Sequence, residues 1–497
     1  MACTTAHSVE TCLQIIASGV TLGRRGDQET AERAFAAALV MTHVPGPAGS
    51  PSGNLALRAL ALYNVSLLRL RQGRKEAQPL REQATAFLDG SGGQDPTPPE
   101  SMSLFNELMA YVLFELGEYR RAIPYCEASI QFFVDTNDSV IVAESLARAG
   151  KCYARIGLRD HAAVPLRAAV KIFRTLAGDP RLPSVLLDLG NALRKGSPEE
   201  AERCYQEVAE LHVSRTQLES ATPAWVNLGV LCSEQGRHAE ALAHYAKALR
   251  VREQSLGTPP ERIGTLLNNM AGAHRRMGQF PEALDLADRA IRVLTPVGGH
   301  YLACAYGTRG MILRDAGRDE EAVEWFRKSA AEHQKQPSPN LETLSEELEN
   351  EAAALERLGR ADEAVTARQR LESVRAAMAE VKAGGVEGAN LDVAPGEGAV
   401  LIELDCGGRT QAVQGSEVTT RLQQRLAEVL KDAGTGYYGG KVVIPEATTL
   451  MYYGADAEAV FDTVQPLLRE EPWCGGAKVT VRQGSQHREV LLTGRVM

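Results

Sequence analysis

The chain has 497 residues, of which 44% are hydrophobic and 24% are charged, as in ordinary globular proteins. Its formal net charge of −9 argues against general binding to nucleic acid or to anionic membranes, although it leaves room for a local basic surface. By length alone about three domains are expected, and fewer if a repeat array absorbs much of the chain.

The N-terminal segment predicts a cytoplasmic protein. Residues 1–16 lack the basic start and long apolar run of a secretion signal. No stretch approaches the roughly 18 apolar residues of a membrane-spanning helix, so we expect no membrane insertion. The nine cysteines include no Cys-x2-Cys pair and several take apolar helical positions, so we expect reduced, buried thiols rather than disulfides.

Two helical hairpins are predicted at the N-terminal end, over residues 8–43 and 54–88. Each would turn at a glycine, Gly26 in the first and Gly73 in the second, because glycine adopts positive φ at little cost. A loop rich in proline, glycine and serine follows each hairpin.

The turn glycine then recurs at intervals of 39 to 47 residues through three quarters of the chain. Alanine lies five residues after eight of the nine glycines, and a small residue lies seven residues before eight of them. A small residue there lets the second helix of a hairpin approach the first. One hairpin cannot bury its apolar face alone, so the repeat predicts a stacked array of about nine hairpins. The turn glycines are Gly26, Gly73, Gly117, Gly157, Gly196, Gly236, Gly278, Gly317 and Gly359.

The clearest repeat unit starts at Trp225 with the pattern Trp-x2-Leu-Gly-x2-Cys, and Ala-x3-Tyr follows at Ala241. This pattern resembles the tetratricopeptide repeat, with Cys232 where an aromatic residue is usual. Most units here run nearer forty residues than the roughly 34 of the short unit. Residues 251–291 resemble the long tetratricopeptide units of kinesin light chain, with which they share the Leu-Asn-Asn-Met-Ala run that starts at Leu267.

The resemblance implies an α-solenoid superhelix whose concave groove is lined by the first helix of each unit. In this family the groove commonly holds extended peptides or peptide C-termini. Basic and amide side chains predominate on the corresponding helix face, with Asp188, Glu234 and Asp315 as acidic exceptions. The predicted groove residues are Arg148, Lys151, Arg155, Asn191, Arg194, Lys195, Asn227, Asn268, Asn269, Arg275, Arg276 and Arg314.

These side chains suit a partner that is acidic and extended. An asparagine amide can pair with both the donor and the acceptor of a peptide backbone, and arginine binds carboxylates with two parallel hydrogen bonds. We therefore expect a protein or peptide partner. The same residues are also compatible with a solvated charged face that binds nothing.

The C-terminal quarter changes from helical to alternating periodicity. A polar last unit at 340–382 suits a capping repeat, and a linker rich in glycine, proline and acids follows at 383–398. Residues 399–497 predict a small α+β domain of order β-β-α-β-β-α-β-β, with which a ferredoxin-like arrangement is compatible. Strands are expected at 400–404, 409–413, 441–444, 448–453, 477–482 and 488–492, and helices at 419–432 and 456–469.

Three features of the sequence resemble metal-binding, phosphate-binding or catalytic motifs, but each lacks residues that the motif needs. The histidines form neither His-x3-His nor His-Glu-x-x-His, so packed or solvated histidines are expected. The glycine-rich segment 434–440 lacks the residues of a phosphate loop and predicts a turn. Gln414, Gly415 and Arg421 resemble the phosphate-binding start of the acylphosphatase family, but the arginine lies two residues too far from the glycine and the expected asparagine is missing after Gly440. No catalytic residue, metal or cofactor is therefore predicted.

Together these patterns predict a mainly α protein, with a tetratricopeptide-type solenoid over residues 8–382 and a small α+β domain after the linker. We interpret it as a non-enzymatic scaffold or adaptor that binds a partner through the concave groove. One alternative is a ligand-sensing or enzymatic C-terminal domain that the repeat array targets. Another is a structural protein whose solenoid self-associates, and the oligomeric state stays open.

Overall fold

A computed structural model describes most of the chain. The described residues are 6–42, 55–90, 99–136, 139–336, 340–384, 398–405, 412–435, 437–444, 447–471, 474, 477–483 and 486–492.

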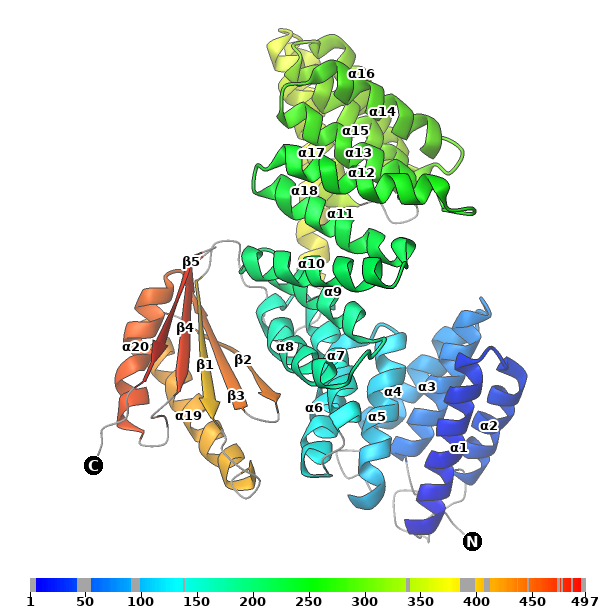
Figure 1. Ribbon diagram of the computed structural model, residues 1–497, viewed down its shortest axis with the longest axis vertical. Coiled ribbons are helices and arrows are strands. Elements are labelled where there is room, and N and C mark those ends of the chain that lie inside the picture. The colour runs from blue at the N-terminus through cyan, green and yellow to red at the C-terminus, as the bar shows by residue number, and fades with distance from the viewer. Residues whose placement is uncertain are drawn as a thin grey trace. The chain divides into compact units, whose positions relative to one another are not determined.

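Eighteen helices, α1 to α18, follow one another through the described residues up to 384 (Figure 1). The first and second helix of a unit pack against each other, for example α11 (Leu218–Glu234) with α12 (His238–Gln254). The mainly α fold expected from the repeat is therefore confirmed. The other helices are α1 (Ala6–Arg24), α2 (Gln28–Met41), α3 (Leu55–Arg71), α4 (Ala77–Gly90), α5 (Pro99–Glu115), α6 (Tyr119–Thr136), α7 (Ser139–Arg155), α8 (Arg159–Thr175), α9 (Leu182–Leu193), α10 (Pro198–Ser214), α13 (Pro260–Arg276), α14 (Phe280–Leu294), α15 (Gly299–Asp315), α16 (Asp319–Gln334), α17 (Leu341–Arg357) and α18 (Ala361–Gly384).

The turn between paired helices depends on the recurring glycine. Eight of the nine turn glycines have positive φ, and Gly236 between α11 and α12 has a φ of 78°. A residue with a Cβ would be strained in that conformation. Gly196 after α9 is the exception, so the expectation of nine equivalent turns is wrong there.

The described residues divide into two compact units. The first contains residues 1–197 together with 391–497, and the second contains residues 198–390. The repeats of each unit bury small and aliphatic side chains between neighbouring helices. In the second unit one such core joins Leu313, Phe326 and Leu355 from α15, α16 and α17.

The C-terminal domain belongs to the first unit and contains one antiparallel sheet of order β2-β3-β1-β4-β5. Helices α19 and α20 cover one face of the sheet (Figure 1), and Val400, Leu426 and Phe461 pack together in the core between them. The order β1-α19-β2-β3-α20-β4 is that of a ferredoxin-like domain, and β5 extends the sheet by one strand. The elements are β1 (Gly398–Asp405), α19 (Ala412–Ala433), β2 (Tyr437–Ile444), β3 (Ala447–Gly454), α20 (Ala457–Glu470), β4 (Lys478–Gln483) and β5 (Gln486–Leu491).

Two expectations for this domain need correction. A strand was expected at 409–413, but Ala412 and Val413 are helical and residues 409–411 lie outside the described residues. The glycine-rich segment 434–440 was expected to be a turn throughout. Its turn is confined to the end of α19, because strand β2 already begins at Tyr437.

Within the first unit, the C-terminal domain packs against the repeat helices. Strand β2 contacts α8 and α6. The guanidinium group of Arg482 on β4 donates two hydrogen bonds to the carboxylate of Asp160 on α8. A Cβ added to Gly196 would lie 2.4 Å from Nη1 of Arg482, so this glycine serves close packing rather than a left-handed turn.

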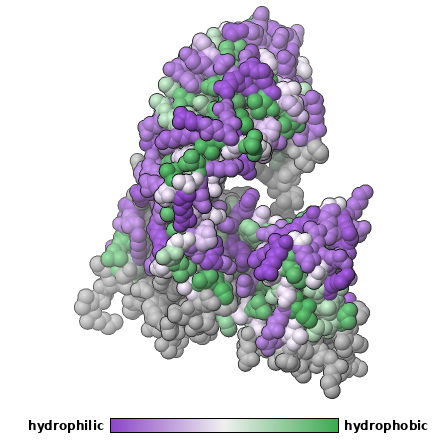
Figure 2. Space-filling view, turned by 45° about the vertical axis from the view of Figure 1, so that its right-hand side comes forward, coloured by the Kyte–Doolittle hydropathy of each residue, from purple (hydrophilic) through white to green (hydrophobic). Residues whose placement is uncertain are grey.

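Hydrophilic residues cover much of the visible surface, and hydrophobic residues form patches between them (Figure 2). Among the described helices, none is long and apolar enough to cross a membrane.

Candidate peptide-binding surfaces

The predicted groove residues belong to both compact units, so we describe them as two surfaces. The α7–α9 surface comprises the predicted residues from Arg148 to Lys195, and the α11–α17 surface comprises those from Asn227 to Arg314 together with Asn350.

In the second unit the first helices form a row, because α11 contacts α13, α13 contacts α15 and α15 contacts α17. Asn227, Asn269 and Asn350 occupy the same place in α11, α13 and α17, each nine residues before its turn glycine, and Thr308 holds that place in α15. The three asparagines are half-buried, whereas Thr308 is buried. Equivalent positions on helices in a row lie on the same side of the row. The structure thus repeats an amide along this surface.

Arg275 and Arg314 share a carboxylate on the same surface. Both guanidinium groups donate hydrogen bonds to Asp315, with Nη2 of Arg314 at 2.8 Å, and Arg314 also donates one to the Oδ1 of Asn350. Burial alone would raise the pKa of Asp315, but these two guanidinium groups outweigh it and hold the pKa below the usual value. The charges of both arginines are therefore partly neutralised, whereas Arg276 is exposed.

Next to Asn269, the side chain of Asn268 is half-buried, and its Oδ1 has no hydrogen-bond partner within the described part of the chain. A buried acceptor without a partner is costly and is uncommon in folded proteins. The atom itself is buried, so a ligand that donates an N–H to it has to displace the side chains that cover it.

The α7–α9 surface is also partly neutralised from within. The Nζ of Lys151 lies 3.2 Å from the carboxylate of Asp188, and burial raises the pKa of that carboxyl despite Lys151 and Arg155. Arg148 is half-buried, and its Nη1 lacks a hydrogen-bond partner in the described structure.

The remaining predicted residues of this surface lie at the end of α9. Asn191 belongs to the last turn of the helix, whereas Arg194 and Lys195 follow it. They were expected on the helix face, and the early end of α9 at Leu193 places both basic residues in the turn instead.

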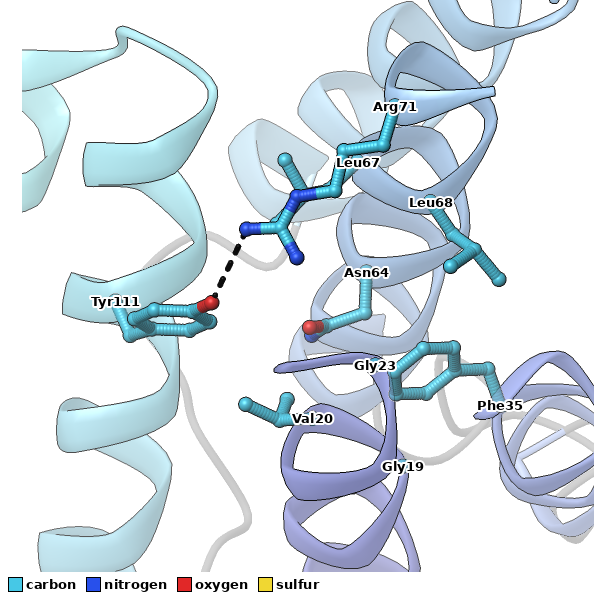
Figure 3. Close-up of a pocket in the computed structure, with 9 residues that line it drawn as sticks. All are labelled: Gly19, Val20, Gly23, Phe35, Asn64, Leu67, Leu68, Arg71 and Tyr111. Atoms are coloured by element: carbon cyan, nitrogen blue, oxygen red, sulfur yellow. Dashed lines mark hydrogen bonds between the residues drawn. The ribbon is translucent and has the colours of Figure 1, made fainter. Parts of the chain in front are cut away.

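Two other places in the described residues, a small cavity and the start of α19, are poorer candidates for a ligand-binding site. A cavity between α1, α2, α3 and α5 has a volume of about 20 Å³ (Figure 3). Its wall includes Asn64 and Arg71, and the guanidinium group of Arg71 donates a hydrogen bond to the Tyr111 hydroxyl at 3.4 Å. This space holds about one water molecule. In the C-terminal domain, Gln414 and Gly415 lie within helix α19, so they do not form the loop of a phosphate cradle.

Two groups of polar residues were missed by the sequence analysis. Asn350 could have been found by aligning the units on their turn glycines. His300 and Cys304 lie four residues apart on α15 and approach His333 on α16. The His-x3-Cys spacing was the sequence signal for that cluster, but only the fold brings in His333.

Comparisons with known proteins agree with the repeat architecture. The family model for the tetratricopeptide repeat matches residues 181–254, 219–295 and 262–334. Protein KINESIN LIGHT CHAIN-RELATED 1 of Arabidopsis thaliana is 23% identical over 302 residues, which cover 57% of this chain and 48% of that protein. The chain thus spans about half the length of this curated relative.

A solved structure shares the fold at low sequence identity. The apo form of RapI superposes with a TM-score of 0.52 at 12% identity, over 76% of this chain and all of that one. BtubC (BKLC) from P. vanneervenii is 21% identical with a TM-score of 0.40, over 46% of this chain and 94% of that one. Residues 181–334 of the chain match tetratricopeptide repeats. Its long units are similar to those of kinesin light chain.

Proposed function

We propose that the protein is a non-enzymatic interaction scaffold that binds an extended, acidic peptide segment of a partner protein on the α11–α17 surface. The observation that carries the proposal is the row of equivalent amides on α11, α13 and α17, with the unpartnered Oδ1 of Asn268 beside it. An asparagine amide offers both a donor and an acceptor, so each of these side chains can pair with the backbone of an extended peptide. Arg276 adds an exposed positive charge for an acidic side chain.

The proposed location is the cytoplasm. None of the seven cysteines of the described residues forms a disulfide, and six of them are buried. Free thiols are typical of reducing compartments.

The decisive experiment measures the affinity of the full chain for a pool of acidic, extended peptides by fluorescence anisotropy. Asn227→Ala and Asn269→Ala should each weaken binding by about 1–3 kcal/mol, because the peptide backbone groups would lose their partners. Arg276→Glu should weaken it further, and added salt should weaken binding to the wild type.

Arg292→Glu is the matched control, since Arg292 is exposed on the second helix α14. It should leave the affinity unchanged, and circular dichroism should show the same helicity for every variant. Equal binding by wild type and the asparagine variants would exclude the α11–α17 surface.

The α7–α9 surface is the second place to test. Reversal of Arg148, Lys151 and Arg155 to glutamate would remove its positive charge. Loss of peptide binding in this variant alone would assign the peptide to the first unit instead.

A further inference from the structure

A cluster of one cysteine and two histidines joins α15 and α16 and contains none of the residues named for the two peptide surfaces. His300 and Cys304 face the same side of α15, because residues four apart in a helix are neighbours. His333 reaches them from the last turn of α16. One ligating atom from each of the three side chains lies within 4.8 Å of the others.

The distances within the cluster suit a tetrahedral metal ion. The Sγ of Cys304 lies 3.6 Å from the Nε2 of His300. In a tetrahedral zinc site, Zn–N bonds of about 2.05 Å and Zn–S bonds of about 2.3 Å place such atoms about 3.6 Å apart. His300 is exposed, so its side chain can adjust to close the longer distances to His333.

His333 is the second observation that points to a ligand. Its side chain is completely buried, and neither Nδ1 nor Nε2 has a hydrogen-bond partner in the described structure. A buried imidazole whose two nitrogens lack partners has a ligand atom to offer, and imidazole is the commonest metal ligand in proteins.

Two hydrogen bonds hold the cluster's helices in place. The backbone N–H of Gly299, next to His300, donates to the Oε1 of Glu332 at 2.9 Å. Ser329 donates to the carbonyl oxygen of Ala303, next to Cys304, at 2.8 Å. Bonds of this kind hold α15 and α16 together beside the ligands, as the supporting contacts of metal sites do.

We propose that His300, Cys304 and His333 bind one Zn²⁺ ion, with water as the fourth ligand on the exposed side. Two imidazoles and a thiolate are ligands that zinc prefers, and a water is common where three protein ligands are present. The thiol of Cys304 loses its proton to the solvent as the Zn–S bond forms. Bound zinc would join the start of α15 to the end of α16 and stabilise this hairpin.

The test uses the full chain without a histidine tag, stripped with a chelator and dialysed against zinc sulfate. Elemental analysis should find one zinc per chain, and a competing chelator should give its affinity. His300→Ala and Cys304→Ser should each weaken binding by at least about tenfold. His274→Ala and Cys204→Ala are matched controls on α13 and α10, and they should bind zinc as the wild type does.

Two further measurements keep the proposal testable if a variant folds poorly. Cobalt(II) bound to wild type should show a thiolate charge-transfer absorption that Cys304→Ser lacks. Zinc should raise the melting temperature of wild type but not of His300→Ala. Absence of stoichiometric zinc from wild type, or wild-type affinity in both ligand variants, would overturn the proposal.

Discussion

At the residue scale, the repeat depends on a contact between a glycine in the first helix and a large side chain in the second. A Cβ on Gly229 would lie 2.4 Å from the Cε1 of Tyr245, and one on Gly310 would lie 2.7 Å from the Cε1 of Phe326. In both units the glycine lies seven residues before the turn and the aromatic nine residues after it. The helices can approach closely only because the first helix has no side chain at this point.

Gly229→Ala should therefore destabilise the protein, by about 1–3 kcal/mol of overpacking before the gain in helix propensity is subtracted. Gly272→Ala is the matched control, because a Cβ there would meet nothing within 4 Å. It should stabilise α13 by about 0.8–1 kcal/mol. Urea unfolding of both variants checks the contrast, and similar effects would show that the Gly229 contact is wrong.

Glu347 on α17 is a buried carboxyl group. Its Oε2 has no hydrogen-bond partner in the described structure, and a Cβ on Gly307 would overlap its Oε1. Burial raises the pKa of Glu347 to about 8, against the opposing effect of the nearby Ser329 side chain and with some help from the charge of Glu346. The native state thus keeps a proton that the unfolded state loses above pH ~4.5.

Because the native state binds this extra proton, stability should fall as the pH rises from about 4.5 to about 8. The loss contributed by Glu347 could reach roughly 5 kcal/mol. Glu347→Gln should remove most of this dependence and make the protein more stable at pH 8.5. Unfolding free energies at pH 5 and 8.5, measured with a chelator present, check the prediction. An equal fall in wild type and variant would contradict it.

At the scale of elements, the C-terminal sheet is joined to the repeats through a half-buried ion pair. The side chains of Arg482 and Asp160 are 21% and 13% exposed, whereas those of Arg488 and Glu458 within the C-terminal domain are 46% and 52% exposed. Both are pairs of an arginine and a carboxylate, so they differ mainly in exposure. Removing one partner leaves the other charge unpaired, and this costs more where water is excluded.

Asp160→Asn should lower the free energy of unfolding by about 1.5–3 kcal/mol, since Arg482 would keep its charge without a carboxylate. Glu458→Gln, which removes one partner of the exposed pair, should cost no more than about 1 kcal/mol. Thermal and urea unfolding of the two variants compare the pairs directly. If Glu458→Gln costs as much as Asp160→Asn, the half-buried contact does not stabilise the native state.

At the scale of the whole molecule, residues far apart in sequence share one compact unit. The first nine helices and the C-terminal domain belong together, although the second unit lies between them in the chain. The sequence predicts a linker at 383–398. The contacts of β2 with α8 and of Arg482 with Asp160 show that the C-terminal domain packs against the repeats, so we expect it to stay associated with them.

Limited proteolysis should cut within 383–398 first, because its composition predicts a linker. After the cut, the C-terminal fragment should still elute with the N-terminal fragment in gel filtration. In the Asp160→Asn variant a larger share should separate. Complete separation of the wild-type fragments would support the independent domain that the sequence suggested.

Local patterns in the sequence were sufficient to predict the repeat and its hairpins. The turn glycine, the small residue before it and the alanine after it act within one hairpin, so their spacing is visible along the chain. The clearest prediction, the unit that starts at Trp225, is confirmed as α11 and α12. In the C-terminal domain, the same local reasoning predicted most strands and both helices, but it missed the early start of α19.

Only the tertiary structure decided which distant side chains meet. Gly196 lacks the positive φ of the other turn glycines, and a Cβ on it would lie against the guanidinium group of Arg482, 286 positions further along the chain. Likewise, Arg275 shares Asp315 with Arg314, and His333 lies against His300. Periodicity predicts the face on which a side chain lies, but pairing between helices depends on how the chain folds back on itself. The tertiary structure therefore decides how much positive charge a peptide would meet on the surface. It also decides which side chains come close enough to bind one metal ion.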